Sequence, residues 1–325
     1  MNDVLSIVIP LFGLILVGMA AGRSALLAKH GRAILDWLLH MLALPALLFH
    51  IVANSSSSVL DVVSFVITVT FGTYCAFAIS FTIAALRNRG DIRDASVKGV
   101  LGSYGGIAHL GPALVLPAFG PVAGLPLALI FFLDGVLVRL LPSLLWAIGG
   151  RDRSSPVIVL KSNVQSGLKE PALVAVVLGI VVAIVGWDLP TAMNTTLDVL
   201  GSVAAPIGLL AVGLALSSYR FDSNGNGQFR WSAALGTKLF IHPAIVYLLV
   251  GWIGDFDPAW TYTALFLAAL PPAWNLGVMG VISDKSKLVE PTAAAGMVLS
   301  IVTITALVAL IVAGVIPADP FVSDR

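Results

Sequence analysis

A short polar stretch interrupts one of the most apolar regions of the chain. Residues 268–280 read A-A-L-P-P-A-W-N-L-G-V-M-G and lie inside an apolar run, Tyr262–Ile282, that is long enough to cross a bilayer. The adjacent prolines Pro271-Pro272 remove backbone donors and clash with a continuous helix. Trp274 and Asn275 follow at a depth where polar atoms are costly. Because irregular backbone survives there only when it is buried in protein or lines a cavity, the stretch predicts a binding site inside the membrane.

A second apolar run carries a comparable interruption. Leu101–Gly120 reads L-G-S-Y-G-G-I-A-H-L-G-P-A-L-V-L-P-A-F-G, with a glycine pair and two prolines inside one expected span. Small residues let helices approach closely in membranes, but glycines and prolines clustered this densely predict a broken helix. Proline suits the first turn of a helix, so we expect Pro112 and Pro272 to begin the second halves of the two broken helices. The candidate substrate contacts are Ser103, Tyr104, Gly105, Gly106, His109, Gly111, Pro112, Pro271, Pro272, Trp274 and Asn275.

The expected direction of these half-helices favours a negatively charged ligand. If the two breaks cross, two helix N-termini converge near the midplane, where free N–H groups and the positive ends of helix dipoles attract an anion. Asn275, Ser103 and Tyr104 can add side-chain hydrogen bonds, and Trp274 can wall the cavity. The predicted site is therefore the size of a carboxylate and built mainly from backbone.

Ionisable residues inside the expected spans form a second group of candidates. Asp134 and Arg139 lie in one span, where charges are expensive and commonly functional. Five residues at about 100° each place them roughly 140° apart, so each is expected to have a partner on another helix. Their roles are a structural ion pair or contact with substrate or coupling ion. His109 either titrates during transport or is a neutral histidine held by backbone groups, while Lys238 and His242 suggest a snorkelling cation and a helix bend.

The amino-acid composition indicates whether water or lipid surrounds these elements. Of 325 residues, 58% are hydrophobic and 11% are charged, whereas a soluble domain carries about a quarter charged residues. The net charge of +1 argues against a nucleic-acid partner. The single cysteine, Cys75, excludes an internal disulfide and a multi-cysteine metal site. We expect an all-α integral membrane protein with the lipid bilayer as its surroundings, and with neither a metal site nor a cofactor apart from an H⁺ or Na⁺ that couples transport.

Hydropathy and length predict ten membrane spans. Their limits are Val4–Ala21, Ile34–Val52, Val62–Leu86, Ser96–Phe119, Leu125–Ile148, Ala172–Trp187, Thr196–Leu216, Ala233–Ile253, Tyr262–Ile282 and Thr292–Ile316. Lys and Arg gather in the links that follow the odd-numbered spans, and the alternate links contain none. Since cytoplasmic loops collect these residues, both termini are expected on the extracytoplasmic side.

The two halves of the chain resemble each other. Pro45 and Pro206 fall within spans two and seven and are expected to bend them, while spans four and nine carry the two breaks. The two spacings nearly coincide, which predicts an inverted repeat: residues 1–149 and 171–325 each form five helices, joined by a cytoplasmic linker at 150–170. Paired interruptions in inverted repeats mark the binding region of a secondary transporter.

These motifs resemble the auxin efflux carrier family. The likeness rests on A-L-P-A-L-L-F in span two, A-P-I-G-L-L-A-V-G-L-A-L in span seven and the proline-broken spans four and nine, and it extends over nearly the whole chain. The family includes plant auxin carriers and bacterial carriers proposed for malonate, malate and similar acids. The resemblance implies ten helices in two repeats, scaffold and transport domains drawn from both repeats, substrate beside a crossover of helices four and nine, and elevator-like movement.

The first break departs from the family pattern. Members commonly carry an asparagine there, followed by a glycine and a proline separated by one residue. In this chain Gly106 occupies the asparagine position, and Gly111 and Pro112 are adjacent. Asn275 in the second break fits the pattern better.

The expected function is secondary or facilitative transport of a small mono- or dicarboxylate across the inner (plasma) membrane, and a homodimer is an expected partner state. No nucleotide-binding motif is present, so H⁺, Na⁺ or the electrochemical gradient remain as alternatives for the drive. A sodium-coupled carrier of the bile-acid symporter type shares the broken-helix plan. A receptor or sensor without turnover is the alternative from another class. No pattern of paired aspartates, clustered histidines or Ser-His residues indicates an enzyme.

Overall fold

The computed structural model describes residues 2–56, 58–87, 90–149, 155–218, 233–254, 256–273 and 286–320. Within these residues the regular structure is entirely helical apart from one isolated β-bridge. The helices are α1 (Asn2–Ala21), α2 (Ala25–Leu38), η1 (Leu39–Ala43), α3 (Leu44–Ala53), α4 (Val59–Arg87), α5 (Ile92–Ser103), α6 (Ile107–Phe119), η2 (Pro121–Ala123), α7 (Gly124–Ile148), α8 (Pro156–Leu168), α9 (Pro171–Val185), α10 (Thr191–Ser202), α11 (Ala204–Ser218), α12 (Ala233–Gly236), η3 (Thr237–Ile241), α13 (His242–Ile253), α14 (Pro258–Ala269) and α15 (Ser286–Val312).

Six helical segments of the described chain are long and apolar enough to cross a membrane, and a seventh is counted if the bent pair α8–α9 forms one span. Each of the ten predicted stretches nevertheless contains helix. Four predicted spans are missing from the count of six. Two of them are broken into the short helices α5, α6 and α14, the first counts only as a shorter apolar helix over Ile7–Ala21, and the sixth counts only when α9 is joined to α8. The ten-span count therefore stays a prediction.

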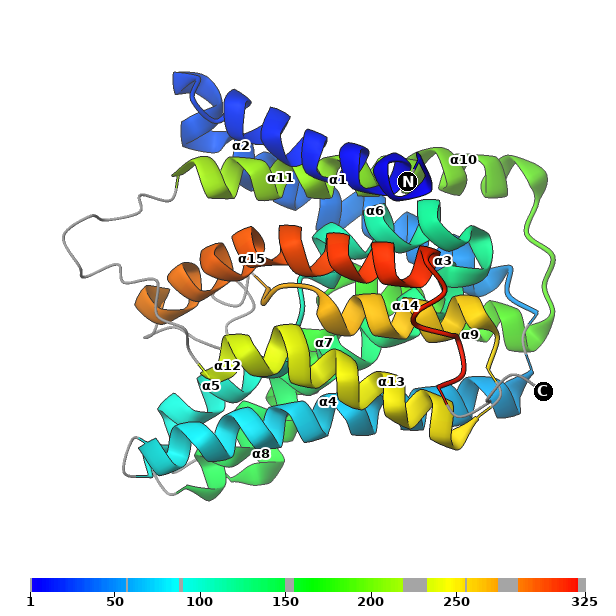
Figure 1. The fold of residues 1–325 in the computed structure, drawn as a ribbon. Helices are drawn as coiled ribbons and strands as arrows, with labels where there is room; N and C mark the ends of the chain where they lie inside the picture. The colour runs from blue at the N-terminus through cyan, green and yellow to red at the C-terminus, as the bar shows by residue number, and fades with distance from the viewer. Residues whose placement is uncertain are drawn as a thin grey trace.

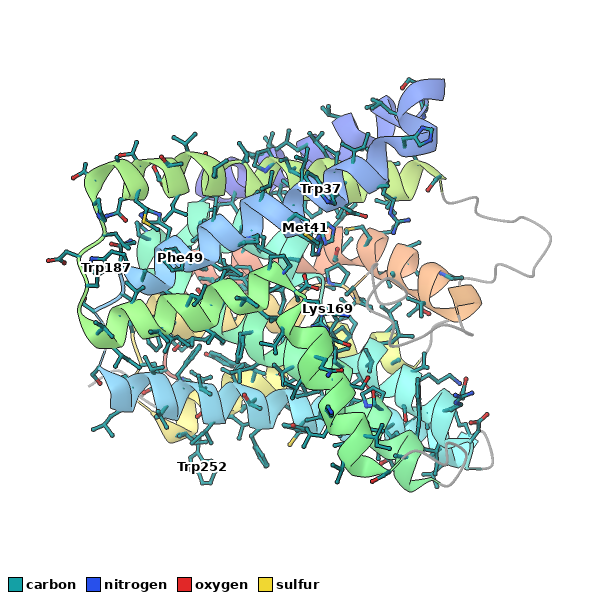
Figure 2. The ribbon with its side chains drawn as sticks, turned by 180° about the vertical axis from the view of Figure 1, so that it is seen from behind. Trp37, Met41, Phe49, Lys169, Trp187 and Trp252 are labelled. Carbon is teal, nitrogen blue, oxygen red and sulfur yellow. The ribbon has the colours of Figure 1, made fainter. Side chains whose placement is uncertain are left out.

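Most helices of the bundle lie along roughly the same axis (Figure 1). The α1–α2 turn and the last turn of α4 lie at one end, and the α9–α10 link lies at the other (Figure 1). The first turn of α1 and the last turn of α15 point toward the end with the α9–α10 link (Figure 1). Trp187 and Trp252 are exposed by 55% and 74%, and both lie toward the end that holds the α9–α10 link (Figure 2). Exposed tryptophans near helix ends are typical of the membrane–water interface.

Glycines bring helices from the two halves of the chain into close contact. A Cβ on Gly213 of α11 would meet the carbonyl oxygen of Ile15 in α1, and one on Gly179 of α9 would lie 2.9 Å from Cβ of Val52 in α3. Close backbone approach of this kind stabilises helix pairs in membranes. Each half thus packs its first helix against the second predicted span of the other half.

Two helical segments widen into a π turn directly before a proline. Leu39–Ala43 precedes Pro45 at the start of α3, and Thr237–Ile241 precedes Pro243 at the start of α13. A proline ring clashes with the carbonyl group four residues earlier in an α-helix, and a π turn is one way to accommodate it. Pro206 lies in the first turn of α11, directly after the interruption at Val203, where its missing N–H costs little.

Candidate functional site

The two helix breaks lie against each other at the centre of the candidate site. Gly105 and Pro272 form an antiparallel β-bridge. The N–H of Gly106 donates to the carbonyl oxygen of Pro271 at 3.0 Å, and the N–H of Ala273 approaches the carbonyl oxygen of Tyr104 at 3.4 Å. Backbone groups released by one broken helix are therefore satisfied by the other, which is the condition for irregular backbone inside a membrane.

The first break begins earlier than the sequence indicated. We expected Pro112 to start the second half-helix, but α6 begins at Ile107 and contains both Gly111 and Pro112. Gly111 instead packs α6 closely on α7, since a Cβ there would lie 2.9 Å from Cδ1 of Leu127. The expected start was wrong because a proline six residues into the helix removes only one interior hydrogen bond, while the backbone at Tyr104–Gly106 leaves the helix to pair with the second break.

The second break lies where the proline pair predicted it. α14 ends at Ala269, and Leu270 adopts an extended conformation with φ −59° and ψ 145°. A residue before proline is disfavoured in the helical region, which accounts for the end of α14. The expected helix start at Pro272 is wrong, because Pro272 is not helical and pairs with Gly105 in the bridge. The side chains of Trp274 and Asn275 lie outside the described residues.

Gly105 and Gly106 occupy different surroundings at the bridge. A Cβ on Gly105 would lie 3.2 Å from both Cβ of Leu270 and Nζ of Lys238. Among the described residues, a Cβ on Gly106 would meet only Cδ1 of Leu110 at 3.8 Å and the carbonyl oxygen of Pro271 at 3.9 Å. The backbone φ of Gly106 is −74°, which any residue can adopt. The position that departs from the family pattern therefore has room for a side chain.

A buried cation lies beside the bridge. Lys238 of η3 has no exposed surface, and its Nζ donates to the carbonyl oxygen of Ala268 in the last turn of α14 at 2.7 Å. Nζ also lies 3.0 Å from Nδ1 of His242. The expected snorkelling role of Lys238 is wrong, because a snorkelling lysine exposes its ammonium group to water. The ammonium group is instead held against the C-terminal, negative end of α14.

Asp134 of α7 provides the counter-charge. It is 4% exposed, interacts electrostatically with Lys238 and is hydrogen-bonded to Thr73 of α4. Oγ1 of Thr73 lies 3.3 Å from Nε2 of His242. The prediction that Asp134 has its partners on other helices is confirmed. Sequence reasoning missed this cluster because Lys238, Thr73 and Asp134 lie in separate spans, and the only local signal was a charge inside each of two apolar segments.

Arg139 is paired away from the bridge. Its Nη1 donates to the carbonyl oxygen of Gly135 at 2.9 Å, and its Nη2 to Oε2 of Glu170 at 3.0 Å. Glu170 is the residue directly before α9. The expected partner outside α7 is confirmed, and the ion pair ties the end of the linker to α7.

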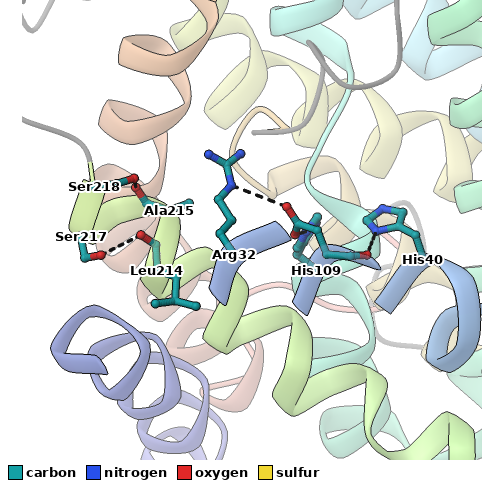
Figure 3. Close-up of polar contacts among 8 residues, drawn as sticks. Arg32, His40, His109, Leu214, Ala215, Ser217 and Ser218 are labelled. Carbon is teal, nitrogen blue, oxygen red and sulfur yellow. Dashed lines mark hydrogen bonds and ion pairs between the residues drawn. The ribbon is translucent and has the colours of Figure 1, made fainter. Parts of the chain in front are cut away.

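A third polar group joins α6 to α2. Nε2 of His109 lies 3.0 Å from Oδ1 of Asp36, whose Oδ2 is 3.6 Å from Nε of Arg32 (Figure 3). His40 contributes Nδ1 at 2.9 Å from the carbonyl oxygen of Asp36, and its ring centroid is 5.3 Å from that of His109 (Figure 3). His109 therefore contacts a carboxylate, and not only backbone. His109 lies in the first turn of α6, so this contact joins α2 to the start of that helix.

The remaining predicted residues are buried close to the first break. Ser103 is 1% exposed and donates Oγ to the carbonyl oxygen of Gly99 at 3.0 Å, and Tyr104 is 4% exposed. No group of three or more His, Cys, Asp or Glu residues suited to a metal ion occurs in the part of the chain that the structure describes.

Comparison with known proteins places this arrangement in a family. A family model described as membrane transport protein matches residues 3–148 and 149–313. The chain belongs to the auxin efflux carrier family of membrane transport proteins. It is 32% identical to a Rhizobium meliloti (strain 1021) protein named "Putative malonate transporter", over 99% of this chain and 100% of the relative. It is 24% identical to "Uncharacterized transporter YfdV" of Escherichia coli (strain K12), over 90% of this chain and 91% of the relative. The two segments matched by the family model meet where the sequence predicted the end of the first repeat.

Proposed function

We propose that this member of the auxin efflux carrier family is a secondary transporter of a small organic anion, bound where the two helix breaks pair. The observation that carries the proposal is the bridge between Gly105 and Pro272 with the ammonium group of Lys238 beside it. The N-terminus of α6 begins at the same point, and its positive dipole end favours negative charge. A dicarboxylate such as malonate is the first substrate to test, because a relative named "Putative malonate transporter" aligns with this chain over its whole length.

The proposed movement is of the elevator type. One unit would contain the bridge with α4–α7 and α12–α15, and would slide against a scaffold of α1–α3 and α9–α11. Support comes from the packing of α1 on α11 and of α3 on α9, which pairs the same two spans in each half. Ten spans, an inverted repeat and termini on the extracytoplasmic side of the inner membrane belong to the same proposal.

We favour H⁺ over Na⁺ as the coupling ion. Asp134 and Lys238 form a buried pair of titratable groups next to the bridge, so one proton gained or lost there changes the charge that the anion meets. Coupling to Na⁺, as in a carrier of the bile-acid symporter type, is the competing proposal.

Uptake of radiolabelled malonate into proteoliposomes tests these proposals together. We expect saturable uptake that an inward H⁺ gradient stimulates and that unlabelled dicarboxylates inhibit. Asn275→Ala, at a predicted substrate contact, is expected to weaken binding without unfolding the protein. Stimulation by a Na⁺ gradient alone would support the symporter-type alternative. Thermal stabilisation by malonate, which reports binding to the folded state, without any uptake would favour a sensor and contradict transport.

A further inference from the structure

The helix that joins the two halves turns sharply away from the bundle. Val157–Leu168 in α8 and Pro171–Val185 in α9 meet at 81°, and Figure 2 shows Lys169 at this elbow. If α9 crosses the membrane, α8 lies nearly in the membrane plane. Interfacial helices of this kind place an apolar face against the acyl chains and a polar face toward water.

A cavity of about 450 Å³ occupies the inside of the elbow, between α7, α8 and α9. This volume falls in the range of roughly 300–1,000 Å³ typical of small-molecule sites. Its wall is almost entirely aliphatic, with all three helices contributing. Representative lining residues are Val136 and Leu140 of α7, Leu160 and Val164 of α8, and Leu173 and Val177 of α9.

The polar side chains of the wall are already engaged within the protein. Arg139 lines the cavity, but its guanidinium group donates to Gly135 and pairs with Glu170. Asn163 donates Nδ2 to the carbonyl oxygen of Val159 at 2.8 Å. The cavity therefore suits a hydrocarbon chain better than the carboxylate of a transported substrate.

Two lysines follow cavity-lining residues of α8 directly in the sequence. Lys161 and Lys169 are exposed, while Val164 and Leu168 on the cavity side of α8 remain 55% and 69% exposed. Lysines on an interfacial helix extend their ammonium groups toward lipid phosphates. The apolar wall thus suits the acyl chain of a lipid, and the lysines next to it suit the phosphate of the same lipid.

We propose that the elbow cavity binds one acyl chain of an anionic phospholipid, with Lys161 and Lys169 holding the phosphate. The site is separate from the bridge between the two helix breaks and does not depend on the identity of the transported anion. The bound lipid would connect α8 and α9 to α7, the helix that carries Asp134.

Gly167 permits a direct test, because it lines the cavity and, of the described atoms, its Cβ position has only Cδ1 of Leu173 within 4 Å, at 4.0 Å. Full-length protein in detergent would be titrated with palmitoyl-oleoyl phosphatidylglycerol, the matching phosphatidylcholine and oleate, and bound lipid counted by native mass spectrometry. We expect one phosphatidylglycerol to bind at least fivefold more tightly than phosphatidylcholine or oleate. Gly167→Phe is expected to weaken that binding at least fivefold, and Lys161→Gln combined with Lys169→Gln to remove the preference over phosphatidylcholine.

Gly13→Phe on α1 is the matched control, since a Cβ there meets no described atom within 4 Å and no residue of α1 lines the cavity. Val164→Trp fills the same cavity from another position if Gly167→Phe does not fold. Equal phosphatidylglycerol binding by wild type and the filled variants would overturn the proposal. So would oleate binding as tightly as phosphatidylglycerol, or a filled variant that changes only the oligomeric state, which would assign the cavity to a second copy of the chain.

Discussion

At the scale of single residues, the candidate site depends on one buried charge and its counter-charge. Lys238 donates a hydrogen bond to the carbonyl oxygen of Ala268 at the end of α14, and its Nζ lies beside Gly105 of the bridge. Asp134 of α7 supplies the opposite charge. Removing one partner of such a pair leaves the other charge buried and uncompensated, whereas removing both is often tolerated. The two effects can therefore be separated by substitution.

We predict that Lys238→Met lowers the stability of the protein by about 3–5 kcal/mol, as expected when a buried charge loses its counter-charge. Adding Asp134→Asn should restore most of the apparent melting temperature. Malonate uptake should stay low in the double variant, because the positive charge beside the bridge is still missing. A double variant with wild-type uptake would show that Lys238 has only a structural role.

Gly106 is the second residue whose substitution we expect to change substrate binding. The space beyond its Cβ position predicts that Gly106→Asn folds normally and adds an amide next to the bridge. One hydrogen bond contributes about 0.5–1.5 kcal/mol, so the affinity for malonate should change up to roughly tenfold. The control is Gly105→Asn, whose Cβ would crowd Leu270 and Lys238 and should reduce thermal stability. Identical affinities of wild type and Gly106→Asn across a carboxylate panel would remove this position from the site.

At the scale of helices, small residues determine how closely the two halves pack. We predict that Gly213→Leu separates α11 from α1, because its side chain would collide with the backbone at Ile15 and Gly18. Overpacking of this kind costs about 1–3 kcal/mol. Gly13→Leu, on the open side of α1, should have little effect on the same thermal-unfolding measurement. Equal melting temperatures for the two variants would contradict the close contact.

The contact between Asp36 of α2 and His109 of α6 is expected to affect the transport rate more than the stability. Asp36 is partly exposed, so its pairing with His109 contributes no more than about 1 kcal/mol. If α6 moves against α2 during transport, this pair breaks in each cycle. We predict that Asp36→Asn changes the maximal uptake rate at least twofold with little change in melting temperature. Lys98→Gln, which removes a 2.7 Å ion pair to Asp94 within α5, should change neither quantity.

At the scale of the whole molecule, the ends of the helices separate into two groups. The α1–α2 turn lies opposite the α9–α10 link (Figure 1). Lys and Arg residues of the sequence gather in the first group of connections and are missing from the α9–α10 link. The rule that positive residues remain in the cytoplasm then predicts which end faces which side.

In a Cys75→Ser background, we predict that Thr195→Cys in α10 reacts with a membrane-impermeant maleimide in intact cells. Gln165→Cys in α8 should react only after permeabilisation, because the linker that contains it is predicted to lie on the cytoplasmic side. Both side chains are exposed on the protein, so packing against other residues does not block the reagent. The reverse labelling pattern would invert the proposed orientation.

The sequence by itself determined the class of this protein and the places where its helices cannot continue. Apolar runs and prolines act locally, so the membrane-protein composition, the end of α14 before Pro271 and the need of Asp134 and Arg139 for partners outside α7 were all predictable. Whole-length similarity to a transporter family agrees with that interpretation.

Only the tertiary structure decided which segments meet. It begins α6 at Ile107 and not at Pro112, buries Lys238 against Ala268, and pairs His109 with Asp36. It also opens a cavity inside the α8–α9 elbow. These features join residues that are far apart along the chain or lie on opposite sides of a break. The secondary-structure preferences of a local stretch do not predict such contacts, because the contacts depend on how closely whole helices pack.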